Sequence, residues 1–356
     1  MLIINCRFLT QDITGVQRFS EEIACRLAET VEDVRLVAPK GNLRRTILGG
    51  RRVEQVGSFT GHLWEQIDLP LILRARSGTL VCLGNTGPLV VRNQVLVVHD
   101  LTWFQAPESY SLKFRTFYHI ITKVLVYRAK VLCTVSDHSK KVLEAHYGLD
   151  SSRVSVVPNA VDESFGNQKD VRPANVGDEE FFLVVSSLNK HKNIAAIVDA
   201  FTEYAQESGS KTKLLLVGGS SSAFSKVDGK KMGSGFEDCF QSIGRVTDGE
   251  LIWLYRHAKA FVFPSLQEGF GIPPLEAQSL GCPVVASSIP ALRETLEESA
   301  LYFDPSSKPS MKRALAKIDS TKALREQLIA AGKSNVTRYS WGRSAERLLQ
   351  AMRANG

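Results

Sequence analysis

The sequence predicts an α/β protein made of two doubly wound parallel sheets that face a central cleft. Short apolar runs of strand length alternate with amphipathic stretches of helix length, which indicates parallel sheets covered by helices. This alternation stops in a polar segment at 163–180, rich in Gly, Asn and Asp, and then starts again. The 356 residues are also enough for two domains. We therefore expect one domain over residues 1–165, a second over 166–338 and a final helix over 339–356.

The first domain begins with the apolar strand LIINC at 2–6, and a helix follows that opens at Gly15 with Thr14 as its N-cap. The same alternation of strand and helix continues to the polar segment. Further strands are expected at 34–39, 79–84, 94–100, 131–136 and 154–162, and helices at 111–129 and from Asp137.

The second domain repeats this pattern. Strands are expected at 181–187, 213–219, 240–244, 260–265 and 282–287, and helices near 193–207 and 248–257, from Pro273, and from 308 to the end. Pro273 and Pro274 suit the first turn of a helix, where no N–H partner is lost. Ligands of such sheets bind at the carboxyl ends of the strands. Residues directly after strands are therefore the first candidates for chemistry.

The charge is unevenly distributed along the chain. The formal net charge is +7, with bases but no acids at 40–52 and seven bases with one acid at 113–141. Such clusters attract phosphate, nucleic acid or anionic lipid. They also occur on an ordinary solvated basic face, so charge alone does not choose a partner.

Targeting and redox features point to a cytoplasmic protein. The N-terminus lacks a basic segment followed by an apolar one, and no run reaches the roughly 18 apolar residues of a membrane span. The six cysteines are scattered without a CxxC pair, which favours a reducing compartment over a disulfide framework or a zinc site.

The most specific segment runs from Glu268 to Glu276, EGFGIPPLE, between an expected strand and an expected helix. Its glycines let the backbone approach a ligand closely, and a helix N-terminus favours a phosphate. Carboxylates accept hydrogen bonds from sugar or ribose hydroxyls. The simpler interpretation is a strand-to-helix turn with a capping glutamate.

Two further candidates follow strands. His99 and Asp100 end the apolar strand QVLVV, and we expect this polar pair to face the cleft rather than the core. Lys192 follows the first strand of the second domain, where a lysine could offset the charge of a leaving diphosphate. The alternatives are a structural histidine and a solvated basic turn.

Several glycines give weaker signals, because each also fits a plain turn. Gly15, the pair Gly218-Gly219, and Gly244 with Val246 shortly after it stand where a backbone could pack against a nucleotide. The sequence has no GxxxxGK[ST], no strand-linked GxGxxG near its start, no HExxH and no Asp-x-Asp. We therefore expect neither a P-loop nor a bound metal, and no cofactor beyond the substrates themselves.

Together these segments resemble family 4 of the glycosyltransferases, which has the GT-B fold, over nearly the whole chain. Glu268 and Glu276 are similar to its E-x7-E motif, and Tyr339-Ser-Trp341 resembles the start of its last helix, which crosses back to the first domain. Further similar segments are VVHDLTWFQAPESY (97–110), CTVSDHSKKVL (133–143), VVPNAVD (156–162) and GRVTDGELIWLY (244–255). GVQRFSEEI and LWEQIDLP (63–70) are most similar to bacterial polysaccharide mannosyl- and rhamnosyltransferases.

The resemblance implies a role for each candidate. Glu276 would hold the nucleotide ribose and Glu268 the donor sugar. Lys192 would stabilise the diphosphate, and His99 would contact the sugar near the reacting carbon. The other donor-binding candidates are Gly15, Ser187, Gly218, Val246, Gly269, Phe270, Gly271 and Ile272. Many members carry an arginine shortly before the lysine, where this chain has Ser186-Ser187, and another cation, Lys190 or His191, would then compensate.

The resemblance further implies a retaining, metal-independent hexosyltransferase that uses a nucleotide diphosphate sugar, with GDP-mannose as the first choice. The acceptor would be a glycan or a polyprenyl-diphosphate-linked oligosaccharide in bacterial O-antigen, lipopolysaccharide or capsule synthesis, and nucleic acid is not an expected partner. A nucleotide-sugar epimerase and a non-catalytic binding subunit are the alternatives. The basic, aromatic helix at 111–130 fits either the anionic inner face of the membrane or an ordinary packed position.

Overall fold

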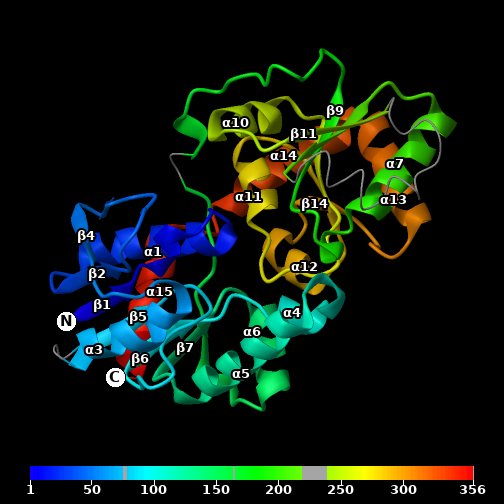
Figure 1. Cartoon of the computed structure of the whole chain (residues 1–356). Coiled ribbons are helices and arrows are strands. Elements are labelled where there is room, and N and C mark those ends of the chain that lie inside the picture. The colour runs from blue at the N-terminus through cyan, green and yellow to red at the C-terminus, as the bar shows by residue number, and fades with distance from the viewer. Residues whose placement is uncertain (75–77, 163–164, 219–238, 356) are drawn as a thin grey trace. The chain divides into compact units, whose positions relative to one another are not determined.

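A computed structural model describes residues 1–74, 78–162, 165–218 and 239–355 (Figure 1). The chain divides into two compact units. Unit 1 comprises Met1–Ala160 together with Tyr339–Gly356, and unit 2 comprises Val161–Arg338. The end of the chain thus belongs to the same unit as its beginning.

Unit 1 is built on a sheet with the strand order β3-β4-β2-β1-β5-β6-β7-β8. All neighbouring strands are parallel except β3 and β4. The strands are β1 (Leu2–Asn5), β2 (Val34–Ala38), β3 (Ile47–Leu48), β4 (Arg51–Gln55), β5 (Thr79–Cys82), β6 (Gln94–Val97), β7 (Val131–Thr134) and β8 (Val154–Val156). The central strands are buried on both faces, as continuous apolar runs in a covered parallel sheet require.

Helices connect these strands. They are α1 (Gly15–Thr30), α2 (Gly61–Leu63), α3 (Leu69–Arg74), α4 (Thr102–Gln105), α5 (Leu112–Arg128) and α6 (Asp137–Tyr147), with the π-helical segment η2 (Trp64–Asp68) and the short 3₁₀ helices η1 (Arg7–Thr10), η3 (Pro107–Ser109) and η4 (Ser151–Arg153). The last helix of the chain, α15 (Trp341–Ala354), also belongs to unit 1. Ser111 caps α5 by accepting from the Phe114 N–H, and Ser136 caps α6 by accepting from the Ser139 N–H.

Helix α15 joins the two ends of the sequence. It packs against α1, and the two helices lie side by side in red and blue in Figure 1. The Trp341 ring meets the Phe19 ring of α1 edge to face, with centroids 5.8 Å apart. The Ser344 hydroxyl donates a 2.6 Å hydrogen bond to the carbonyl of Pro158. The expected return of the last helix to the first domain is therefore confirmed.

Unit 2 has a parallel sheet with the order β11-β10-β9-β12-β13-β14. Its strands are β9 (Phe181–Val185), β10 (Lys213–Val217), β11 (Phe240–Gly244), β12 (Ala260–Phe263), β13 (Val284–Ser287) and β14 (Ala300–Phe303). Its helices are α7 (Ile194–Ser208), α10 (Asp248–His257), α11 (Ile272–Ser279), α12 (Pro290–Leu296), α13 (Lys308–Ser320) and α14 (Lys322–Val336), with the turns η5 (Phe165–Asn167) and η6 (Lys190–Lys192). Two sheets that are parallel except for the β3–β4 pair thus confirm the predicted fold class.

Several details differ from the sequence-based expectation, which included neither β3 and β4 nor β14. The basic stretch at 40–52 contains β3 and the first two residues of β4, and two of its arginines are used within unit 1. Arg44 forms a 2.6 Å ion pair with Glu21, and Arg51 donates to the carbonyls of Ala28 and Val31 at the end of α1. The strands expected at 94–100 and 154–162 end earlier, at Val97 and Val156.

Among the described residues, none of the helices combines the length and the apolar character that crossing a bilayer would demand.

The packing of α15 generates a stability prediction. Trp341→Ala removes a side chain that is 3% exposed, and loss of its contacts together with the resulting cavity should lower the free energy of unfolding by about 3–5 kcal/mol. Urea denaturation followed by circular dichroism measures this change. Arg347→Ala, at an exposed position of the same helix, should change the value by less than about 0.5 kcal/mol. Equal effects of the two substitutions would contradict the assigned packing.

Candidate functional site

The carboxyl edge of the unit 2 sheet collects candidate residues from distant parts of the sequence. Strands β11, β10, β9 and β12 are neighbours in that order, and Val246, Gly218, Ser187 and Glu268 follow them along the chain. Two backbone hydrogen bonds continue the ladder past the strand ends. The Gly218 N–H donates to Gly244 at 2.8 Å, and the Ser186 N–H donates to Val217 at 2.9 Å. Parallel pairing therefore brings these positions to one edge.

Gly218 is required at this edge for steric reasons. Its φ of +96° lies in the left-handed region, and a Cβ there would come within 2.3 Å of the Ser186 carbonyl oxygen. Only glycine lets the chain leave β10 in this conformation. Its neighbour Gly219, predicted with it, lies outside the described residues.

Lys192 and Glu268 contact one another directly. The turn η6 is joined to the loop after β12 by a 2.7 Å hydrogen bond from the Leu266 N–H to the His191 carbonyl. Lys192 Nζ then lies 2.6 Å from Glu268 Oε1, and the two side chains are 20% and 13% exposed. Both residues were predicted to contact a ligand, but the sequence did not indicate this ion pair. The pair keeps opposite charges together at the edge of the sheet while each retains some exposure.

The loop between Glu268 and α11 is tightly constrained. Gly271 has a φ of +99°, and a Cβ there would lie 2.6 Å from Leu292 Cδ2. The Thr295 hydroxyl holds the loop by donating a 2.8 Å hydrogen bond to the Phe270 carbonyl. Pro273 and Pro274 have no N–H. Backbone donors at the start of α11 must therefore come from Gly269 to Ile272, the segment predicted to face a sugar and phosphate.

Glu276 occupies the buried face of α11. Its side chain is 6% exposed, and the Tyr255 hydroxyl donates to its Oε2 at 3.3 Å. A nearly buried carboxylate needs hydrogen bonds, and Tyr255 supplies one from α10. The motif thus places one acidic side chain before α11 and the other within its first two turns.

His99 lies in unit 1, at the carboxyl end of β6. Its Nε2 is 2.8 Å from the Leu83 carbonyl oxygen, which can only accept, so Nε2 carries the proton and Nδ1 presents a lone pair. The ring meets the Phe19 ring edge to face at 4.7 Å. Burial lowers the pKa of His99 below its ordinary value, against the opposing effects of the Leu83 carbonyl and Asp100. The ring is therefore neutral around pH 7.

The expectation that His99 and Asp100 both face away from the core requires correction. The His99 side chain is only 4% exposed, because Phe19 of α1 covers it. Asp100 instead accepts hydrogen bonds from the backbone N–H and the hydroxyl of Thr102, which shapes the turn into α4.

Gly15 is the first residue of α1, as predicted, and follows β1 after η1. Thr14 occupies the N-cap position, but its side chain makes no capping hydrogen bond. Its hydroxyl donates to the Gln17 side chain instead. Thr14 therefore takes the predicted N-cap position but does not cap the helix through its side chain.

A second polar cluster at the carboxyl edge of the unit 1 sheet was missed. Asn5 donates a 2.7 Å hydrogen bond to Glu65, and Arg7 lies 3.4 Å from the same carboxylate while donating to Thr86 at 2.9 Å. Burial by itself would raise the pKa of Glu65, but the hydrogen bond with His62 and the positive charge of Arg7 outweigh it, so this pKa is lowered. The same reasoning that predicted His99 also applies here, since Asn5 is the last residue of β1, Arg7 follows it and Thr86 follows β5.

In residues 1–74, 78–162, 165–218 and 239–355, no three His, Cys, Asp or Glu side chains are grouped so that they could hold a metal ion.

Comparisons with known proteins match both units. Residues 13–165 match the family described as Glycosyltransferase Family 4, and residues 167–335 match the family described as Glycosyl transferases group 1. The chain is 31% identical over 251 residues to the O-antigen chain mannosyltransferase RfbU of Salmonella typhimurium, which covers 70% of this chain and 68% of that protein. It is 28% identical to the serotype-specific mannosyltransferase WbdA of Escherichia coli over 70% of this chain, but the match spans only 32% of WbdA.

The fold is also that of a solved structure. Sucrose-phosphate synthase from Thermosynechococcus elongatus superimposes with a TM-score of 0.75 at 17% identity, over 99% of this chain and 98% of that one. At this identity the likeness establishes the arrangement of secondary structure, not the reaction.

The buried, neutral His99 generates a prediction of pH dependence. Because its folded-state pKa is depressed, the unfolded chain binds a proton first as the pH falls below about 6.5. This histidine should therefore lower stability on acidification by up to about 1.4 kcal/mol per pH unit, and His99→Gln should flatten the profile. Chemical denaturation at several pH values between neutral and mildly acidic measures the difference. His257→Gln, at an exposed histidine, is the control, and an identical slope for wild type and His99→Gln would contradict the assignment.

Proposed function

Because the chain belongs to glycosyltransferase family 4 and has its GT-B fold, we propose that it moves a mannosyl or related hexosyl group from a nucleoside diphosphate to a growing bacterial glycan. Members of this family are retaining, metal-independent hexosyltransferases. GDP-mannose is the proposed donor, and a glycan or polyprenyl-diphosphate-linked oligosaccharide of O-antigen type is the proposed acceptor. The names of RfbU and WbdA support mannose as the sugar.

One observation carries this proposal. The polar and glycine residues that follow β11, β10, β9 and β12 share one edge of the unit 2 sheet. A nucleotide diphosphate sugar needs a close backbone approach, a cation for its phosphates and acceptors for its hydroxyls. Gly218, Lys192 and the two acids of the 268–276 motif supply these groups. Ser187 and Val246, at the ends of the same strands, complete the proposed donor surface.

The proposed roles follow from position and charge. Glu276, held by Tyr255, accepts hydrogen bonds from the ribose hydroxyls, and Glu268 accepts from hydroxyls of the donor sugar. Backbone N–H groups of the loop before α11 donate to sugar and phosphate. When the donor binds, the Lys192 ammonium shifts part of its ionic interaction from the Glu268 carboxylate to the diphosphate. Ser186-Ser187 stand where many members carry an arginine, and Lys190 or His191 is proposed to compensate for that missing cation.

The proposed reaction retains the configuration of the sugar. The bond between the anomeric carbon and the phosphate oxygen breaks first, the diphosphate keeps the electron pair, and an oxocarbenium-like centre forms. The acceptor hydroxyl attacks from the same face, and its proton passes to the departing phosphate. The protein positions the partners and stabilises the leaving charge. The neutral His99, with its Nδ1 lone pair, is proposed to accept a hydrogen bond from a hydroxyl of the transferred sugar.

The donor proposal is tested by thermal-shift screening against GDP-, UDP- and dTDP-sugars. A ligand that binds the folded state raises the melting temperature, and GDP-mannose should give the largest rise. Glu276→Gln removes a charged hydrogen-bond acceptor worth about 1.5–3 kcal/mol, so the dissociation constant for the preferred nucleotide should rise about 10- to 100-fold. Glu326→Gln, on an exposed side chain of α14, is the matched control. No shift with any nucleotide sugar would refute the donor proposal.

The catalytic role of Lys192 is tested by kinetics. Lys192→Ala should lower the turnover number about 10²-fold or more, because a preorganised cation no longer meets the leaving diphosphate. Stability should change little, since partly exposed ion pairs contribute about 0–1 kcal/mol. Lys322→Ala, whose side chain is 81% exposed, controls for the loss of a positive charge. Wild-type turnover in Lys192→Ala would disprove the role.

A further inference from the structure

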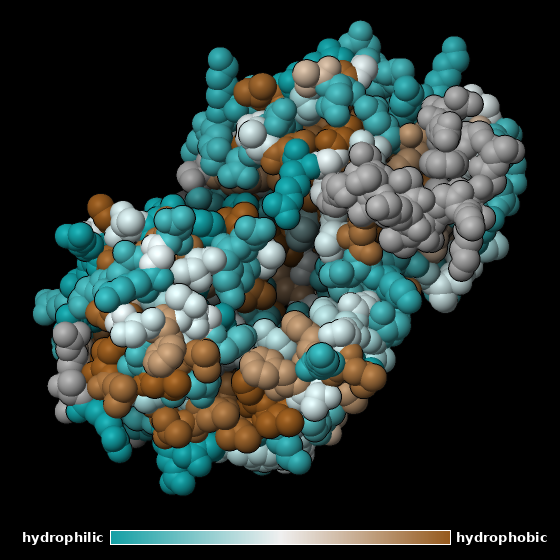
Figure 2. Space-filling view, in the orientation of Figure 1, coloured by the Kyte–Doolittle hydropathy of each residue, from teal (hydrophilic) through white to brown (hydrophobic). Residues whose placement is uncertain are grey.

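Exposed apolar side chains are concentrated on one surface of unit 1. Figure 2 shows this surface as a brown area in the lower part of the view, over α3 and α5. We call it the docking face and define it by six exposed residues: Leu63, Ile67, Leu71, Val90, Phe117 and Ile120. Val90 is 67% exposed and Leu63 is 60% exposed. Soluble proteins rarely expose large apolar side chains in one contiguous patch, and such a patch usually marks an interaction site.

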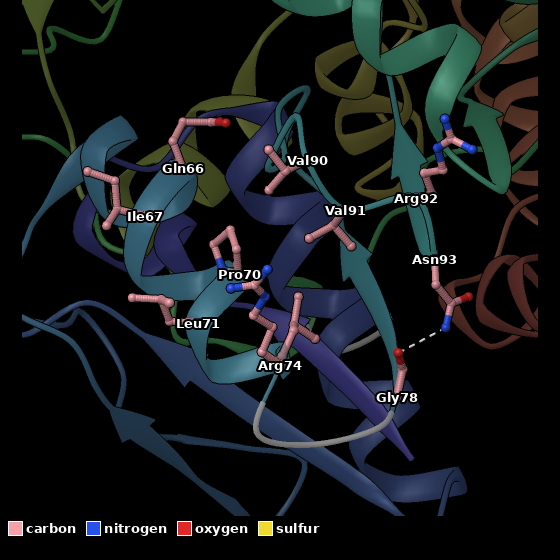
Figure 3. Close-up of a pocket in the computed structure, with 11 residues that line it drawn as sticks. Gln66, Ile67, Pro70, Leu71, Arg74, Gly78, Val90, Val91, Arg92 and Asn93 are labelled. Atoms are coloured by element: carbon pink, nitrogen blue, oxygen red, sulfur yellow. Dashed lines mark hydrogen bonds between the residues drawn. The ribbon is translucent and has the colours of Figure 1, made fainter.

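Contacts make this face continuous across three segments. The His62 ring, next to Leu63, lies 5.0 Å from the Phe117 ring of α5. Across the face, η2 and α3 form one wall of a groove of about 780 Å³, and the segment before β6 forms the other. Figure 3 shows Ile67, Pro70 and Leu71 on the first wall, with Val90 and Val91 on the second. The apolar surface is therefore both a helix stripe and a groove.

Helix α5 has an unusual distribution of apolar residues. Ile121 and Leu125 face the core of unit 1, as expected of a helix packed on a sheet. Phe117, Ile120 and Tyr127, spaced three and seven residues apart, form a second apolar stripe that is 39–55% exposed. An ordinary packed helix would present polar residues there.

The charges around the docking face are positive. Helix α5 carries four bases and no acid between Leu112 and Arg128, and Arg74 and Arg92 line the groove. Lys113, Lys123, Arg74 and Arg92 are all exposed. The two acids of η2, Glu65 and Asp68, are buried and hydrogen-bonded inside the unit. A second copy of this face would meet it with like charge, whereas an anionic surface would be attracted.

We propose that the docking face binds an anionic lipid bilayer. The apolar side chains enter the boundary between headgroups and acyl chains, and the surrounding lysines and arginines meet lipid phosphates. The inference rests on the proposed function, since a polyprenyl-linked acceptor is held in such a membrane. It extends the expectation made for residues 111–130 to η2, α3 and the loop at Val90.

The test is co-sedimentation of the whole protein with vesicles of phosphatidylcholine, with and without phosphatidylglycerol. Binding should require the anionic lipid. Arg74→Ala with Lys123→Ala removes two charges worth about 1 kcal/mol each near an anionic surface, so partitioning should fall about 30-fold. Leu71→Ser with Ile120→Ser should also weaken binding, through loss of apolar burial.

Matched controls separate the face from general charge and hydrophobicity. Ile47→Ser with Val171→Ser changes apolar residues that are 56% and 48% exposed elsewhere, and Lys322→Ala with Arg353→Ala removes two exposed bases elsewhere. These controls should bind like wild type, and circular dichroism melting checks that every variant folds. The proposal is overturned by absence of binding to anionic vesicles, by equal binding to neutral ones, by equal losses in the controls, or by self-association that the face variants abolish.

The outcomes also separate this proposal from the proposed function. If a nucleotide sugar raises the melting temperature but the protein does not co-sediment with vesicles, only the membrane proposal is overturned. If the protein binds anionic vesicles through this face but does not bind a nucleotide sugar, only the donor proposal is overturned. The face variants should keep the wild-type thermal shift with nucleotide sugar, because none of the substituted residues belongs to unit 2.

Discussion

Parallel strand pairing is the constraint on which the candidate sites depend. In a parallel sheet every strand points the same way, so residues that follow different strands gather at one edge. Ser187, Gly218 and Val246 come from separate parts of the chain, yet the ladder β11-β10-β9 brings them together. The same constraint collects Asn5, Thr86 and His99 at the carboxyl edge of unit 1. The apolar runs between these positions are buried strands whose packing holds the edge in place.

Around these edges, the packing of neighbouring side chains sets the orientation and environment of the titratable groups. The His99 ring is held by the Leu83 carbonyl on one side and by Phe19 on another, and Phe19 in turn meets Trp341 of α15. The last helix of the chain therefore supports the environment that keeps His99 neutral and fixes its tautomer. In unit 2, Tyr255 plays a comparable part for Glu276. In both cases a titratable group is oriented by a neighbour that takes no part in the proposed chemistry.

The ion pair between Lys192 and Glu268 joins a cation, which the phosphates of a nucleotide sugar require, to a carboxylate, which can accept from its hydroxyls. Each side chain satisfies the other at 2.6 Å, and each is partly exposed. A diphosphate would compete with Glu268 for the ammonium, and a sugar hydroxyl would take up the acceptor capacity released on the carboxylate. The docking face adds a different constraint, because its exposed apolar and basic residues are explained by an anionic bilayer and not by the packing of unit 1.

The sequence by itself determined the fold class, the family and the positions worth testing, because alternating apolar runs and the residues directly after them depend on local order along the chain. Only the tertiary structure decided which side chains contact one another. The ion pair of Lys192 joins segments 76 residues apart, and Glu65 is buried against Asn5 and Arg7 from another strand end. It also decided that His99 is covered by Phe19, and that apolar residues of α3 and α5 share one exposed surface. Such contacts depend on how elements pack in space, and no local pattern records which distant side chains will meet.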